Sequence, residues 1–243
     1  MAYRAEGFET GGVYHLLNRG VEQLVIFTDE QDYSRFISLL EFQRVPKSLG
    51  FSEAKRVARI RRAQFLEYSA AKHGSESPIV NVLCYCLMPN HFHLLVQQNV
   101  TGGISRYMQR LLNSYSRYFN ARHKRTGTLF ASQFRGIRVT TDNQLLHVSR
   151  YIHLNPVVAR LCKDAFSYPW SSIYAYANTD GKAAQKILSV HIASDLLSGI
   201  MSAKEYEMFL RRHTTYAKEL ARIKHLLLEE GARIPTFTNF RSR

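Results

Sequence analysis

Cysteine is scarce in this chain, which has three among 243 residues: Cys84, Cys86 and Cys162. That is too few for the dense disulfide framework of a small secreted protein. Cys84 and Cys86 lie two apart in an apolar run, and the second cysteine pair that a zinc site would need is absent. We therefore predict small buried thiols in a reducing compartment.

Long apolar runs are also missing, since none approaches the roughly 20 residues that a membrane helix needs. The first twelve residues lack the apolar segment of a secretory signal. We expect a cytoplasmic protein that makes no membrane contact. Because 45% of the residues are hydrophobic, global disorder is excluded as well.

Acidic residues are in short supply relative to basic ones. The 33 Lys and Arg residues exceed the 19 Asp and Glu residues by enough to give a formal net charge of +14. Such a surface attracts polyanions, so nucleic acid is the expected partner. Charge alone does not separate DNA from RNA, nor an enzyme from a binding protein.

The periodicity of apolar residues predicts alternating strands and helices over the first two thirds of the chain. The expected elements are a strand over 12–18, a helix from a capping box at Thr28 and Gln31, strands over 79–87 and 91–97, a helix after Gly102-Gly103, a strand over about 133–140, and a helix from 141 or 142 to about 155, ended by Pro156. This order predicts an α+β fold, a ferredoxin-like or RRM-like sandwich with an antiparallel sheet.

Two regions stand apart from this pattern. A basic insertion over about 44–77 has helical character around 52–72. We place a domain boundary after residue 178, and 179–243 as a helical C-terminal extension with helices near 185–197, 203–212 and 215–230. Neither region receives a functional role from its sequence.

His91 and His93 are the first candidates for chemistry. Side chains two apart on a strand project from the same face, roughly 7 Å apart, so two imidazoles can converge on one ion while Phe92 points into the opposite layer. A pair of histidines that merely lines a polar sheet face would have the same spacing. The motif alone leaves both interpretations open.

The last helix adds a second group of candidates. His147, Tyr151 and Asn155 follow each other at intervals of four residues and so share one helical face. Leu145, Val148 and Ile152 belong to another, apolar face that can pack on the sheet, which leaves Tyr151 with no evident need to be in the core. A tyrosine with a carboxamide oxygen one turn later could serve phosphoryl transfer, although a half-buried packing tyrosine is equally compatible.

The chain resembles the single-tyrosine HUH transposases of the IS200-like group, and within them the REP-associated tyrosine transposases. The resemblance spans about residues 11–178 and rests on several stretches in a fixed order. They are GVYHLLNRG (12–20), LMPNHFHLLV (87–96), TGTLFASQFR (126–135), and RYIHLNP (150–156) followed by YPWSS (168–172).

The resemblance implies a role for each matched residue. His91 and His93 match the metal-binding pair, Tyr151 the nucleophile, and Asn155 the polar residue that helps to hold the metal. A transposase domain over 1–178 would use Mg²⁺ or Mn²⁺ to cleave and rejoin single-stranded DNA folded into hairpins, through a 5′-phosphotyrosine link. Palindromic REP-type repeats are the implied substrate, and a monomer is the expected state, with a dimer as the alternative.

Several other residues are candidates for a place in the chemistry or in DNA contacts. Tyr115 is a rival nucleophile, but its spacing continues an apolar helical stripe and predicts core packing. His147 and His153 are candidate proton acceptors only because they flank Tyr151 in the sequence. The candidates for DNA contacts are Arg106, Arg110, Arg117 and Arg135. Arg135 and Arg138 lie three positions apart on the predicted strand, so their side chains point to opposite faces and only one of them can share the histidine face.

Two other classes of function remain open from the sequence. One is a nucleic-acid-binding module without chemistry, which would be indifferent to loss of the Tyr151 hydroxyl. The other is a zinc hydrolase that uses His91, His93 and another histidine such as His15, and that would form no covalent protein–DNA adduct.

Overall fold

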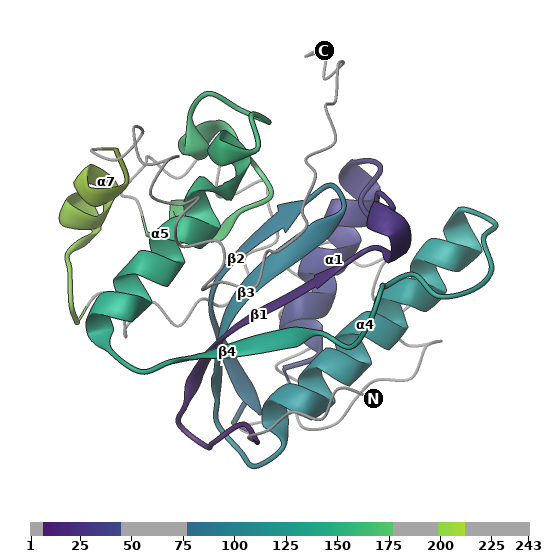
Figure 1. Ribbon diagram of the computed structural model, residues 1–243, viewed down its shortest axis with the longest axis horizontal. Helices are drawn as coiled ribbons and strands as arrows, with labels where there is room; N and C mark the ends of the chain where they lie inside the picture. The colour runs from purple at the N-terminus through teal and green to yellow at the C-terminus, as the bar shows by residue number, and fades with distance from the viewer. Residues whose placement is uncertain (1–6, 45–76, 177–198, 212–243) are drawn as a thin grey trace.

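The computed structural model describes residues 7–44, 77–176 and 199–211, shown in colour in Figure 1. The strands are β1 (Val13–Arg19), β2 (Val80–Met88), β3 (His91–Gln98) and β4 (Arg135–Val139). The α-helices are α1 (Glu30–Phe42), α4 (Gly103–Arg122), α5 (Asp142–Val158) and α7 (Ala203–Arg211). Short 3₁₀ turns are η1 (Val21–Gln23), η2 (Ala165–Ser167) and η3 (Ser172–Ala175).

The four strands form one antiparallel sheet in the order β2-β3-β1-β4. Together with the helices α1 and α4 that connect them, this is the strand order of a ferredoxin-like α+β sandwich, so the predicted fold class is confirmed. Strand β3 lies in the interior of the sheet, with β1 on one side and β2 on the other. Its backbone is hydrogen-bonded along both edges, which fixes its register firmly.

The two faces of the sheet have separate apolar cores. Helices α1 and α4 cover one face, and α5 and α7 lie on the other (Figure 1). Alternation along β3 sends Phe92 and Leu94 into the α1–α4 core and Leu95 into the α5 core. Because β1 pairs with β3 in register, His15 and Leu17 face α5, whereas Leu16 faces α1 and α4.

The start of α1 differs from the prediction. The capping residue is Asp29, not Thr28, and its carboxylate accepts from the backbone N–H of Gln31 at 3.0 Å and of Asp32 at 3.2 Å. Two backbone N–H groups of the first helical turn are thereby satisfied by one charged acceptor, which a threonine hydroxyl does less well. Thr28 binds the Asp32 carboxylate instead, at 2.6 Å.

The end of α5 also corrects the prediction, because Pro156 lies inside the helix, which continues to Val158. Proline has no N–H to donate to the carbonyl four residues earlier, and its ring crowds that carbonyl, but the helix continues because this stretch is packed on all sides. The last turn is closed beyond the proline by Ala159, whose N–H donates to the Asn155 carbonyl at 2.9 Å. The strand bounds differ from prediction by at most two residues at either end, and the start of β3 is as predicted.

The YPWSS stretch, residues 168–172, covers the outer edge of β2. The Tyr168 hydroxyl donates to the Leu87 carbonyl at 2.6 Å, and the Leu87 N–H donates to the Trp170 carbonyl at 2.9 Å. The Ser172 hydroxyl accepts from the Tyr85 N–H at 2.8 Å. An edge that would otherwise present unpaired backbone groups is satisfied in this way.

Helix α7 lies on the α5 side, where Tyr206 and Leu210 are buried in the same core as α5. It matches the predicted helix near 203–212. The predicted insertion helix around 52–72 and the predicted helices near 185–197 and 215–230 lie outside the described residues. The domain boundary after residue 178 remains a prediction.

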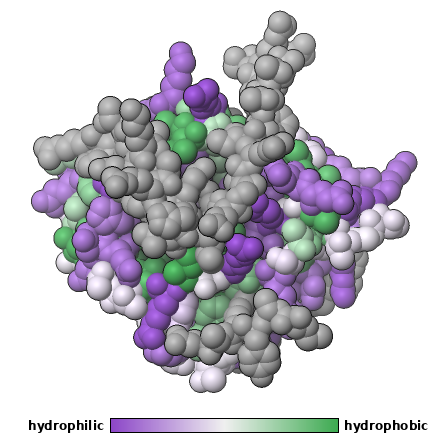
Figure 2. Space-filling view, in the orientation of Figure 1, coloured by the Kyte–Doolittle hydropathy of each residue, from purple (hydrophilic) through white to green (hydrophobic). Residues whose placement is uncertain are grey.

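Cys84 and Cys86 are fully buried, as predicted, and burial raises the pKa of each thiol. Among the described residues, no helix is both long enough and apolar enough to cross a membrane. On the face shown in Figure 2, the visible described residues are mainly hydrophilic, with small hydrophobic patches between them.

Candidate active site

His91 and His93 lie on β3 and face α5, as strand alternation predicts. Their ring centroids are 5.0 Å apart and the rings are nearly perpendicular. His91 is partly exposed and His93 is fully buried. The Nδ1 atom of His91 is 2.6 Å from the amide oxygen of Asn90, which orients the ring through a hydrogen bond from Nδ1–H.

His15 of β1 is the partner of His93. Its Nε2 atom lies 3.0 Å from His93 Nδ1, and the two rings stack with centroids 5.1 Å apart. Both side chains are fully buried. The hydrogen bond fixes the orientation of His93, and a neutral pair requires one ring to donate and the other to accept. Sequence reasoning named His15 only as a possible zinc ligand and missed this contact.

Tyr151 of α5 packs against the same two imidazoles. Its ring centroid is 5.4 Å from that of His93 and 6.0 Å from that of His15, both in edge-on geometry. The strand-borne and helix-borne candidates are thus brought together. Tyr151 nevertheless lies in the core, although the helical pattern showed no need for it: its side chain is 1% exposed and belongs to the α5 core.

The burial of Tyr151 has a simple cause. Every residue of α5 from Val148 to Pro156 is buried, so the helix has no solvated polar face in this stretch. The helix lies against the sheet on one side, and η2, η3 and α7 add further cover around it. A four-residue interval identifies a common face but does not say whether that face meets water.

Asn155 follows Tyr151 by one turn and is 6% exposed. Its amide nitrogen donates to the Tyr151 carbonyl at 3.4 Å, which leaves the amide oxygen as the atom that could bind a metal. Since Nδ1 is engaged in both His91 and His93, each ring would bind a cation through Nε2. Two imidazole nitrogens and one amide oxygen are a donor set that fits a divalent cation with water in its remaining positions.

The described residues contain no group of three or more His, Cys, Asp or Glu side chains arranged to hold a metal. The zinc-hydrolase alternative requires such a group, made of His91, His93 and a third histidine such as His15. The His15 nitrogen nearest to His93 is directed at the partner ring.

The histidines that flank Tyr151 in the sequence lie elsewhere. The Nδ1 atom of His153 is 2.9 Å from the Tyr206 hydroxyl, and its Nε2 is 2.9 Å from the Ser172 hydroxyl. Complete burial lowers the pKa of His153 to about 3, which makes it a poor proton acceptor. His147 lies beside Arg150, whose guanidinium is 2.8 Å from its Nδ1.

Tyr115, the rival nucleophile, lies on the opposite face of the sheet. It is fully buried in the α1–α4 core, and its hydroxyl donates to the carbonyl of Ile26. Burial raises its pKa far above the ordinary value of 10. The prediction that Tyr115 packs in the core is confirmed.

The predicted DNA-binding arginines divide between the two faces. Arg106, Arg110 and Arg117 lie on α4, in the layer opposite to the histidines. Burial and the neighbouring charge of Arg106 lower the pKa of Arg110. Arg135 of β4 pairs with Leu17 and shares the histidine face, whereas Arg138 faces the other way and binds Glu9 at 2.6 Å.

Residues 61–155, which include both β3 histidines, Tyr151 and Asn155, match a transposase family, described as Transposase IS200 like. The predicted resemblance to IS200-like transposases is confirmed. The transposase match covers the β2–β3 hairpin, α4, β4 and most of α5, and therefore the predicted metal pair and nucleophile.

The comparison with solved structures returns a protein described as the REP-associated tyrosine transposase bound to a REP hairpin. Its sequence is 12% identical, the alignment covers 81% of this chain and 93% of that one, and the TM-score is 0.49. No curated protein matches the chain at a significant level.

Proposed function

We propose that this chain is a metal-dependent single-stranded DNA endonuclease and strand transferase that acts through a covalent 5′-phosphotyrosine intermediate. Its substrate would be hairpin-forming, REP-like palindromic DNA, and its role DNA transposition. The observation that carries the proposal is the packing of Tyr151 against His93, with ring centroids 5.4 Å apart. The match to IS200-like transposases over residues 61–155 supports the same role.

His91, His93 and Asn155 are the residues that would hold Mg²⁺ or Mn²⁺. When bound there, the cation would polarise the scissile phosphate and offset the negative charge that develops during its displacement. His15 is a positioning residue in this scheme, since its hydrogen bond to Nδ1 of His93 directs the other nitrogen of that ring toward coordination.

Tyr151 would supply the nucleophile. Its phenolic oxygen attacks the phosphorus, the bond from phosphorus to the preceding 3′-oxygen breaks, and a 5′-phosphotyrosine link forms. The phenol loses one proton and the departing 3′-oxygen gains one, so no net proton is consumed. Attack of a 3′-hydroxyl on the phosphotyrosine reverses these bond changes and rejoins the strand.

The burial of the nucleophile bears on the substrate. Tyr151 is 1% exposed, so DNA must displace the groups that cover it before the phosphate reaches the hydroxyl. A single strand can bend into such a site more easily than a duplex, and its unpaired bases can stack on aromatic side chains. We expect cleavage next to a hairpin, in its unpaired flank.

The decisive experiment is to incubate the full chain with Mn²⁺ and labelled single-stranded DNA that carries a REP-like hairpin. A covalent adduct should survive denaturing electrophoresis, and Tyr151→Phe should remove it. Tyr115→Phe is the matched control, because it removes a buried hydroxyl from the other face of the sheet. An adduct that persists in Tyr151→Phe contradicts the proposal, and a wild-type protein that binds DNA but forms no adduct favours the non-catalytic binding module.

A further inference from the structure

A small cavity lies beside the candidate active site, between the end of β1 and the segment that leads into β4. Its volume is about 120 Å³. The residues that line it are Leu17, Asn18, Arg19, Ala131, Ser132, Gln133 and Arg135. Two of the lining side chains are cations and none is a carboxylate.

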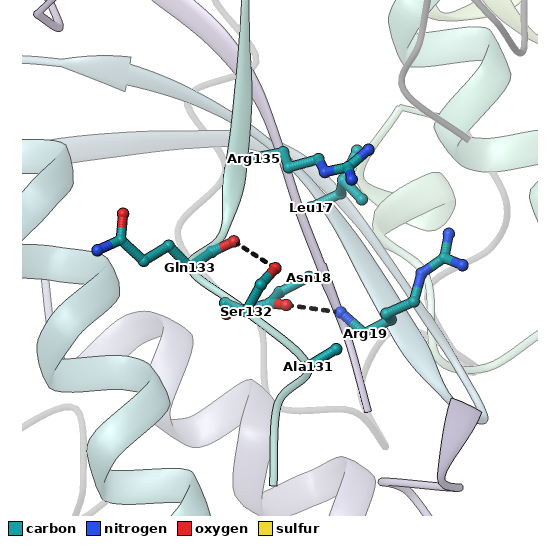
Figure 3. A pocket seen from close by; sticks show the side chains of 7 residues that line it. All are labelled: Leu17, Asn18, Arg19, Ala131, Ser132, Gln133 and Arg135. Atoms are coloured by element: carbon teal, nitrogen blue, oxygen red, sulfur yellow. Dashed lines mark hydrogen bonds between the residues drawn. The ribbon is translucent and has the colours of Figure 1, made fainter. Parts of the chain in front are cut away.

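The sheet register places both cations on the histidine face. Arg19 pairs with His91, and Arg135 pairs with Leu17, which in turn pairs with His93. Directly paired residues point to the same face with Cβ atoms about 5 Å apart. The Arg19 and Arg135 guanidinium groups extend from the same side of the β1–β4 pair, whereas the Gln133 side chain extends the other way (Figure 3).

Asn18 fixes the backbone around Arg19. It is 4% exposed, and its amide oxygen accepts from the Arg19 N–H at 2.8 Å. Its amide nitrogen donates to the Ser132 carbonyl at 3.1 Å, which joins β1 to the segment before β4. The Ala131 N–H also donates to the Arg19 carbonyl, at 3.0 Å. Hydrogen bonds therefore hold the end of β1 and the segment before β4 together where they form the wall of the cavity.

Arg19 is partly buried, and its guanidinium makes no hydrogen bond or ion pair with the described residues. A guanidinium offers a fork of donors whose geometry matches two phosphate oxygens. Arg135 is exposed at the mouth of the same cavity. Arg19 thus lies in the cross-strand row of His91, and Arg135 lies in the row of His93, on the same face of the sheet. Two cations are therefore placed next to the candidate metal pair, where a second anionic group could bind.

We propose that Arg19 and Arg135 together clamp a backbone phosphate of the DNA strand that neighbours the scissile phosphate. This inference rests on the proposed function for the location of the scissile phosphate. The clamp would hold the strand across β1 and β4, so that the adjacent phosphate lies over His91 and His93. It would read no base, because a phosphate contact sets the position of a strand but not its sequence.

The test uses a labelled single-stranded oligonucleotide with a REP-like hairpin, in which each flanking phosphate is replaced in turn by a neutral methylphosphonate. Affinity is measured with the full chain carrying Tyr151→Phe, so that cleavage does not consume the probe. We expect one methylphosphonate position to weaken binding by about tenfold, the cost of one charged hydrogen-bonded contact. In Arg19→Ala or Arg135→Ala that same position should have little further effect.

Arg138→Ala is the matched control, since it removes the same charge from the opposite face of β4, where Arg138 binds Glu9. It should keep the full methylphosphonate effect. Arg19→Lys should keep most of the salt dependence of binding and lose part of the affinity, because lysine has charge but no fork. Each alanine variant of the clamp should lower the slope of log affinity against log salt by about 0.7, the value for one single-strand phosphate contact.

Thermal unfolding of the Arg19 and Arg135 variants should match that of Arg138→Ala, which separates lost contacts from lost folding. The clamp is refuted if Arg19→Ala binds like Arg138→Ala, or if its effect is the same at every methylphosphonate position. If the wild type forms the adduct but the arginine substitutions and the methylphosphonate positions act independently, the clamp alone is refuted. If the arginine substitutions remove the effect of one methylphosphonate position but the wild type forms no adduct, the clamp is supported and the proposed chemistry is refuted.

Discussion

Acidification should weaken this fold through one histidine. His153 is fully buried on α5, with the Tyr206 hydroxyl 2.9 Å from one ring nitrogen and the Ser172 hydroxyl 2.9 Å from the other. These contacts join α5 to α7 and to the segment that covers β2. Burial disfavours the imidazolium and lowers the pKa to about 3, against 6.5 for an exposed ring.

The direction of the effect follows from proton binding in the two states. Above pH 6.5 the ring is neutral in both states, and its contribution does not change with pH. Between pH 6.5 and pH 3 the unfolded chain binds a proton that the folded chain excludes, so the free energy of unfolding falls as the pH is lowered. At pH 4.5, two units below 6.5, the loss should be about 3 kcal/mol from this residue alone.

The measurement is urea unfolding of the wild type and of His153→Gln at pH 7 and at pH 4.5. Glutamine keeps a donor and an acceptor but does not titrate, so the other ionisable groups contribute equally to both proteins. The wild type should lose about 3 kcal/mol more than the variant between the two pH values. Equal losses would refute the reasoning, as would an NMR titration in which His153 of the folded protein changes charge near pH 6.5.

Three further predictions can be checked with the same materials. Tyr115→Phe should lower the free energy of unfolding by about 1 to 3 kcal/mol in urea, because the Ile26 carbonyl loses its donor, and it should still form the DNA adduct. Gly20→Ala should reduce the melting temperature strongly, since the added methyl would overlap the Leu24 carbonyl oxygen; an unchanged melting curve would contradict this. Removal of divalent cations with a chelator should abolish adduct formation on a denaturing gel, and added Mn²⁺ should restore it while Tyr151→Phe stays inactive.

The order of strands and helices could be predicted because each element carries its own periodicity. The ends of elements were less predictable, since they depend on which of several polar groups reaches the backbone. At the start of α1, threonine and aspartate are adjacent in the sequence, and only the structure shows that Asp29 is the cap. At the end of α5, Pro156 is a strong local signal that the packing of the helix overrides.

The candidate site was predictable in part. Strand alternation placed His91 and His93 on one face, the four-residue interval on the last helix made Tyr151 a candidate, and the family resemblance indicated it as their counterpart. His15 and Arg19 were missed because their roles depend on the pairing of β1 with β3, across more than 70 residues of sequence. The sequence did carry one signal, since alternation along the strand puts His15 and Arg19 on the same face as Leu17. Nothing in the sequence says which element packs on that face or which residues pair with them.

Strand β3 supplies functional side chains to both faces of the sheet, so the length of the turn that precedes it is tightly constrained. Alternate residues of this strand supply the packing beneath α1 and the imidazoles beneath α5. An insertion between Met88 and His91 that shifted the pairing of β3 by one residue would turn both imidazoles into the α1–α4 core and put Phe92 on the face of the candidate metal ligands. Mutation can therefore reshape the loops of this protein far more freely than it can lengthen or shorten that turn.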